Sequence, residues 1–81
     1  MTPKIIKQLI ETRLPDADVK VESEDGTHFK AFIISELFTG KSMLQQHRMV
    51  YEALGSKIGK DIHALSLKTF TPQQNKNVNK A

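Results

Sequence analysis

The sequence predicts a small α+β domain in which helices pack against a three-stranded sheet. Three observations predict this class. Apolar residues first recur at helical spacing, then alternate with charged residues every second position, and later return to helical spacing before a last apolar run. The expected order is helix, strand, strand, helix, strand, with room for a short terminal helix. A length of 81 residues suits one such domain.

The first helix is predicted over residues 3–14. Thr2 followed by Pro3 is typical of an N-cap and a first helical position, and Pro15 ends the pattern. The apolar residues at helical spacing are Ile5, Ile6, Leu9, Ile10 and Leu14. We therefore expect this helix to bury one face.

Two strands are predicted to follow as a hairpin. From Asp18 onward, Val19 and Val21 alternate with charged residues. Residues 24–26, Glu-Asp-Gly, supply a turn, and a second apolar run extends over residues 28–35.

A second helix and a third strand complete the predicted domain. Ser42 and Gln45 have the spacing of a capping box, and the helix they open should run to Leu54 with Gly55 as its stop. Its inner stripe is predicted to be Leu44, His47, Val50 or Tyr51, and Leu54. The third strand is expected at about residues 62–70. A helix connects the second and third strands, so they should be parallel if adjacent, which makes the sheet mixed.

The domain is predicted to span residues 1–72. Thr71 and Pro72 could cap a short final helix, whereas the polar tail, residues 73–81, has Val78 as its single sizeable apolar residue and is expected to be disordered.

The chain has no cysteine, which fits a reducing compartment and excludes thiol catalysis and an all-cysteine metal or iron–sulfur site. Lys7 and Gln8 interrupt the first apolar residues, so neither a signal peptide nor a membrane span is expected. The predicted location is the cytoplasm.

The charge distribution gives weak support to nucleic-acid binding. The formal net charge is +3, of which Lys76 and Lys80 in the tail contribute two, so the body of the chain is nearly neutral. The candidate phosphate contacts are the cations of the second half: Lys41, Arg48, Lys57, Lys60 and Lys68.

The three histidines are the candidate metal ligands. His63 lies near the start of the third strand, and its simpler interpretation is a half-buried histidine at the sheet edge. His28 opens the second strand after an acidic turn, as either a solvated histidine or a ligand. Two imidazoles would be half of a four-coordinate site, so a partner would have to supply the rest. His47 falls on the inner helix stripe and is expected to pack and satisfy a local hydrogen bond.

No catalytic constellation is found. Residues 38–42, Phe-Thr-Gly-Lys-Ser, are similar to the end of a phosphate-binding loop, but the glycine that such a loop needs five positions before Gly40 is Ser35. A strand-to-helix turn with a solvated lysine is the simpler interpretation, and an anion site at the helix start is the alternative. No serine has an evident base and acid at interpretable spacing, so an enzyme is not expected.

Several spaced motifs resemble the BolA-like family over almost the whole chain, from Ile5 to Pro72. They are Phe38-Thr-Gly-Lys-Ser, His47-Arg48, Val50-Tyr-Glu-Ala-Leu54, His63-Ala-Leu-Ser-Leu and Thr69-Phe-Thr-Pro72. The short turn with Gly26-Thr-His28-Phe29 is most similar to the IbaG/YrbA branch of the bacterial members. The resemblance implies a fold like that of a class II KH domain, in agreement with the order of elements above.

The resemblance also implies a function. Family members form heterodimers with monothiol glutaredoxins and share a [2Fe–2S] cluster, and by position His63 matches the family's histidine ligand. The partner's cysteine and its bound glutathione complete the other half. Many members carry the second ligand, His or Cys, in a longer loop. Here His28 is the nearest candidate, and Asp25 is weaker because carboxylate is a harder ligand.

The resemblance therefore implies an iron–sulfur-linked adaptor for cluster trafficking or sensing. One alternative is a nucleic-acid-binding transcriptional regulator, since some members act on DNA. The other is a protein-interaction module that needs no metal.

Overall fold

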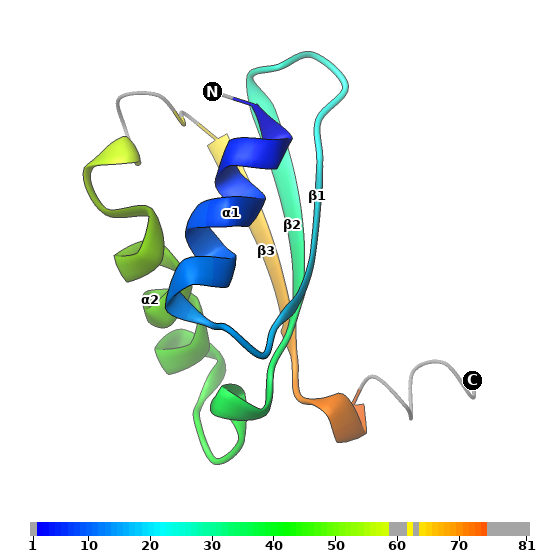
Figure 1. Ribbon diagram of the computed structural model, residues 1–81, viewed down its shortest axis with the longest axis vertical. Coiled ribbons are helices and arrows are strands. Elements are labelled where there is room, and N and C mark those ends of the chain that lie inside the picture. Colours follow the sequence, from blue (N-terminus) through cyan, green and yellow to red (C-terminus); the bar gives the residue numbers. More distant parts are fainter. Residues whose placement is uncertain (1, 59–61, 63, 75–81) are drawn as a thin grey trace.

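The computed structural model describes residues 2–58, 62 and 64–74 (Figure 1). Its helices and strands are, in order, α1 (Pro3–Arg13), β1 (Asp18–Glu22), β2 (His28–Ile34), α2 (Met43–Leu54) and β3 (Ala64–Phe70). Short 3-10 helices, Glu36–Phe38 and Gly55–Lys57, flank α2. The strand order is β1-β2-β3, with β1 antiparallel and β3 parallel to β2. The predicted α+β class, order of elements and mixed sheet are confirmed.

The helix α1 begins as predicted and ends one residue early. Thr2 is the N-cap and its Oγ1 accepts a hydrogen bond of 3.3 Å from the backbone N–H of Ile5. Ile6 and Ile10 are fully buried, whereas the side chain of Ile5 is 43% exposed. The buried face is therefore narrower than the run of apolar residues suggested.

The core lies between the helices and one face of the sheet. Both α1 and α2 lie on the same side of the three strands (Figure 1). The buried apolar side chains of the strands point to that side, and they are Val19, Phe29, Ala31, Ile33 and Leu67. The opposite face of the sheet is covered by neither α1 nor α2.

The helix α2 has the predicted ends. In the capping box the Ser42 N–H donates to Gln45 Oε1 at 2.8 Å and the Gln45 N–H donates to Ser42 Oγ at 3.1 Å. Gly55 follows Leu54 with a φ of 56°, a backbone conformation that a residue with a Cβ rarely adopts.

The predicted inner stripe of α2 is partly wrong. Leu44 is 63% and Tyr51 41% exposed, and the buried residues are Gln46, Val50 and Leu54. The Nε2 group of Gln46 donates to the backbone carbonyls of Phe38, at 3.2 Å, and Lys41, at 3.0 Å. A polar side chain takes the inner position because it satisfies carbonyls of the turn before the helix.

The third strand begins two residues later than predicted, at Ala64. Ile62 is buried and forms an isolated parallel bridge with Ile58. After the strand, the Thr71 N–H donates to Gln74 Oε1 at 2.8 Å and the Gln74 N–H donates to Thr71 Oγ1 at 3.2 Å. This reciprocal cap opens a helical turn at residues 72–74.

Most of the predicted tail, residues 75–81, lies outside the described residues. Within the described part of the chain, no helix is long and apolar enough to cross a membrane.

Candidate functional site

The carboxylate of Asp25 and the hydroxyl of Ser23 hold the turn between β1 and β2. Asp25 Oδ1 accepts hydrogen bonds from the backbone N–H groups of Thr27, at 2.9 Å, and His28, at 2.8 Å. Ser23 Oγ accepts another from the Gly26 N–H at 2.9 Å, and Gly26 has a φ of 73°. These bonds are those of an Asx turn, so the side chain of Asp25 keeps a defined position although it is exposed.

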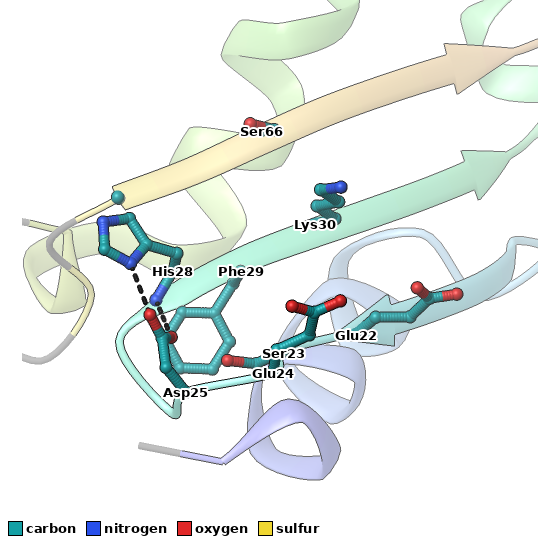
Figure 2. A pocket seen from close by; sticks show the side chains of 9 residues that line it. Glu22, Ser23, Glu24, Asp25, His28, Phe29, Lys30 and Ser66 are labelled. Atoms are coloured by element: carbon teal, nitrogen blue, oxygen red, sulfur yellow. Dashed lines mark hydrogen bonds and ion pairs between the residues drawn. The ribbon is translucent and has the colours of Figure 1, made fainter.

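The other oxygen of this carboxylate orients a histidine. Asp25 Oδ2 lies 2.7 Å from His28 Nδ1, and Figure 2 shows the two groups facing each other. The hydrogen bonds from the His28 backbone N–H, the His28 side chain and the Thr27 N–H hold the pKa of Asp25 well below its usual range. An ionised carboxylate only accepts, so this contact favours the tautomer of the neutral imidazole in which Nδ1 carries the proton and Nε2 has the lone pair.

His28 is accessible to a ligand from outside the chain. Its side chain is 73% exposed, and Nε2 has no hydrogen-bond partner among the described residues. A carboxylate on one ring nitrogen fixes the tautomer and raises the basicity of the other, as is common for metal-bound histidines. In donor chemistry, His28 therefore fits one ligand of an iron–sulfur cluster.

The position of His28 in the sheet relates it to His63. His28 and Ala64 are register partners in the parallel pair β2 and β3. His63 directly precedes Ala64 in the chain, but it lies outside the described residues. The pairing brings His28 beside the residue that follows the other candidate ligand.

A cavity of about 270 Å³ adjoins His28 (Figure 2). It is lined by the hairpin turn and the ends of the strands, with Glu22, Ser23, Glu24, Asp25, His28, Phe29, Lys30, Ala64 and Ser66. The candidate ligand thus stands at a recess in the surface.

Asp25, the weaker ligand candidate, orients His28 in the structure. Both of its oxygens already accept hydrogen bonds, and they position His28. No group of three His, Asp or Glu side chains able to hold a metal ion occurs among residues 2–58, 62 and 64–74.

His47 has the predicted partial burial but lacks the predicted hydrogen bond among the described residues. It is half-buried on α2, as a packed residue should be. The expected local hydrogen bond is wrong, since its ring makes none within the described part of the chain.

The glycine-containing turn before α2 uses its amides internally. The Lys41 N–H donates to the Phe38 carbonyl at 3.1 Å, and the Ser42 N–H is taken by Gln45. Gly40 has the positive φ of 79° that the turn requires. This geometry favours the simpler interpretation, a strand-to-helix turn, over an anion site.

The predicted phosphate contacts do not form one surface. Lys41 is exposed just before α2, and Arg48 is exposed on α2. Thr69 points toward α2, because its Oγ1 donates to Gln46 at 2.7 Å, so the preceding Lys68 points to the opposite face of the sheet. Lys57 closes the 3-10 helix after α2, and Lys60 lies outside the described residues.

The fold and the site define a class of protein. It is a three-stranded α+β domain of the kind predicted above, with a carboxylate-oriented histidine exposed at the start of its central strand. The sequence profile described as BolA-like protein matches residues 7–74. The chain belongs to the BolA-like family.

Individual relatives agree with this assignment. The chain is 36% identical over 67 residues to BolA-like protein 1 of Mus musculus, covering 83% of this chain and 49% of that protein. It is 42% identical over 45 residues to the DNA-binding transcriptional regulator BolA of Escherichia coli, covering 56% and 43%. The chain thus spans about half the length of these curated relatives.

A solved structure agrees over nearly the whole chain. The BolA protein homologue from Coxiella burnetii is 48% identical, has a TM-score of 0.83, and is matched over 94% of this chain and 97% of that one. The predicted fold is confirmed by this likeness.

Proposed function

We propose that this chain is an iron–sulfur-linked adaptor that forms a heterodimer with a monothiol glutaredoxin and shares a [2Fe–2S] cluster with it. The observation that carries the proposal is the 2.7 Å contact between Asp25 Oδ2 and His28 Nδ1, which leaves Nε2 of an exposed imidazole available. Membership of the BolA-like family supports it. The role is that of a cytoplasmic adaptor and not of an enzyme.

The ligands from this chain are His63 and His28 in this proposal. His63 is assigned by its position in the family motif, and His28 by its carboxylate partner and its pairing with Ala64. The partner's cysteine and its glutathione supply the remaining ligands, which suits a chain without cysteine.

Histidine ligation suits transfer or sensing better than storage. A bound cluster would supply an iron–sulfide unit whose reduction potential is higher with imidazole ligands than with thiolates alone. Asp25 keeps the proton on Nδ1, and Nε2 must be unprotonated to bind, so acid favours release.

The test mixes the protein with a monothiol glutaredoxin that carries its glutathione-ligated [2Fe–2S] cluster. Visible absorption and circular dichroism are recorded for the wild type and for His63→Ala, His28→Ala and His47→Ala. We expect a new spectrum that requires His63 and His28 and is unaffected at His47, which lies on α2. A wild-type mixture whose spectrum equals that of glutaredoxin alone would overturn the proposal.

The same variants distinguish the cluster-sharing adaptor from a protein-interaction module that needs no metal. Calorimetric titration of each variant with cluster-free glutaredoxin measures the apo complex. If the apo complex forms with every variant and the wild-type mixture keeps the spectrum of glutaredoxin alone, the interaction-module alternative is favoured.

A nucleic-acid-binding role is the second candidate function. It is favoured by the likeness to an Escherichia coli protein named as a DNA-binding transcriptional regulator. A steep loss of affinity for DNA with added salt would support it. Of the predicted contacts, Lys41 and Arg48 lie at α2 and Lys68 points to the opposite face of the sheet, so these three do not share one surface.

A further inference from the structure

One face of the sheet is covered by neither helix, and its side chains are defined by the strand pairing. Residues alternate between the two faces of each strand, and those opposite the core side are exposed or half-buried. Register partners in neighbouring strands point to the same side. The uncovered face therefore consists of rows of side chains that cross the strands.

Its central row is Lys20, Phe32 and Lys68, one residue from each strand. The next row is Asp18, which begins β1, together with Ile34 and Phe70, which end β2 and β3. Phe32 and Phe70 are half-buried and both lysines are exposed. The aromatic residue of the central strand thus has a lysine as its register partner in each neighbouring strand.

On the other side of the central row, Lys30 of β2 pairs in register with Ser66 of β3 and with Glu22 of β1. Lys20 forms an ion pair of 3.1 Å with Glu22, but both side chains are largely exposed and the pair is weak. Lys30 and Lys68 have no ion-pair partner within the described part of the chain.

We propose that this uncovered face binds a single-stranded nucleic acid, with Phe32 and Phe70 stacking on bases and Lys30 and Lys68 contacting phosphates. Aromatic side chains on an open sheet that stack on unpaired bases are a recurrent way of binding single strands. Ammonium groups beside the rings supply the complementary charge for the phosphates. The acidic residues in the strands of this face, Asp18 and Glu22, are confined to the edge strand β1. Glu24 and Asp25 of the hairpin turn line the same recess as Lys30, so Lys68 has the surroundings with fewer carboxylates.

A duplex does not fit this face. A three-stranded sheet is wider than the α-helix or two-stranded ribbon that the major groove admits, and stacked base pairs do not expose the base faces to a phenyl ring. A second copy of the chain fits poorly, because it would bury the ammonium groups of this face in the interface. Unpaired bases match both the aromatic and the cationic groups.

This inference goes beyond the proposed function and does not depend on a cluster. Phe32 follows His28 by four residues in the same strand, which corresponds to about 13 Å. The central row therefore lies away from the candidate ligand, so a change at Phe32 or Lys68 can weaken nucleic-acid binding without touching His28, whereas Lys30 lines the same recess as His28.

The test measures fluorescence anisotropy of a labelled 12-nucleotide oligothymidylate, its oligouridylate counterpart and a 12-base-pair duplex, over a range of salt concentrations. We expect the single strands to bind more tightly than the duplex, and the better of the two to identify DNA or RNA as the occupant. Phe32→Leu should weaken binding by roughly fivefold to a hundredfold, whereas Phe32→Tyr, which keeps a ring, should retain it. Lys30→Gln should reduce the salt slope by about 0.7.

The matched control is Lys7→Gln, an exposed lysine on α1, on the other side of the sheet. It should change neither the affinity nor the slope, and Arg48→Gln tests the alternative surface at α2. Unfolding midpoints of all variants are compared, so that loss of folding is distinguished from loss of binding.

Four results would overturn the inference. The first three are no binding of single strands at low salt, equal binding of the duplex, and binding that Arg48→Gln weakens while Phe32→Leu does not. The fourth is sedimentation that shows a dimer disrupted by Phe32→Tyr as well as Phe32→Leu, which would assign the face to self-association.

Discussion

Thr69 Oγ1 donates a hydrogen bond of 2.7 Å to Gln46 Oε1 in the buried layer between β3 and α2. Through Nε2, the same amide of Gln46 donates to the carbonyls of Phe38 and Lys41, so one side chain joins the third strand, the helix and the turn before it. This contact fixes which face of β3 points inward. It consequently directs Lys68 to the uncovered face.

We expect Thr69→Val to destabilise the protein. Valine has nearly the same shape, but it leaves the buried Gln46 Oε1 without a donor, which costs about 1–3 kcal/mol. Urea unfolding followed by circular dichroism measures the loss. Ser66→Ala, an exposed position on the same strand, is the control and should stay within about 0.5 kcal/mol of the wild type. Equal stability of Thr69→Val and the wild type would contradict the contact.

The carboxylate of Asp16 makes the free energy of unfolding depend on pH. Asp16 Oδ1 accepts a hydrogen bond of 2.7 Å from the buried Ser35 Oγ, and Oδ2 accepts one of 2.8 Å from the Glu36 N–H. The Ser35 hydroxyl, together with the Glu36 N–H, lowers the pKa of Asp16 in the folded state. A lowered pKa contributes stability that is present above the unfolded-state value and is lost as the pH falls through the folded-state value.

Asp16→Asn should therefore lower stability by about 1 kcal/mol at pH 7 and by less in acid. Urea unfolding at several pH values between 2 and 7 checks this, because the difference between the two proteins should shrink below about pH 4. A difference that stays constant or grows toward low pH would show that the ionised carboxylate is not what stabilises this junction.

Replacing one carboxylate oxygen of Asp25 by an amide nitrogen should weaken His28 as a ligand without disrupting the hairpin. In Asp25→Asn the amide oxygen can still accept from the Thr27 and His28 N–H groups. The amide nitrogen would then face His28 Nδ1 and donate to it, so the imidazole proton would move to Nε2. We expect cluster transfer from glutaredoxin to weaken about 10- to 100-fold.

Two measurements separate this effect from a structural one. Nitrogen NMR of His28 should report an Nδ1–H tautomer in the wild type and Nε2–H in Asp25→Asn. Ser23→Ala, which removes a different turn hydrogen bond, should leave the tautomer unchanged. If both variants reduce cluster transfer equally while the tautomer stays the same, Asp25 only shapes the turn.

Local signals in the sequence were sufficient for most of the fold. Three of these signals depend only on neighbours within a few residues, and each is present in the structure. They are the capping box of Ser42 and Gln45, the Thr2 cap and the alternation from Asp18 onward. Such contacts are set by short-range hydrogen bonding and periodicity.

The errors arose where a residue's environment is made by distant segments. A polar residue such as Gln46 is predicted to be exposed unless its partners on β3 and in the preceding turn are known. The cross-strand row of Lys20, Phe32 and Lys68 likewise exists only through the register of three strands. Hydrophobic spacing shows that a strand has two faces, but it does not show which side chains meet across the sheet.

The end of α2 offers a test of backbone conformation alone. Gly55 has a φ of 56° and a ψ of −132°, and an added Cβ would meet nothing within 4 Å. Gly55→Ala should therefore lose about 1–3 kcal/mol through backbone strain and not through a clash. Gly55→Asn should lose a similar amount, because the left-handed region that asparagine tolerates has a positive ψ. Urea unfolding with Ser56→Ala as the control measures both, and full stability of the asparagine variant would contradict this conformation.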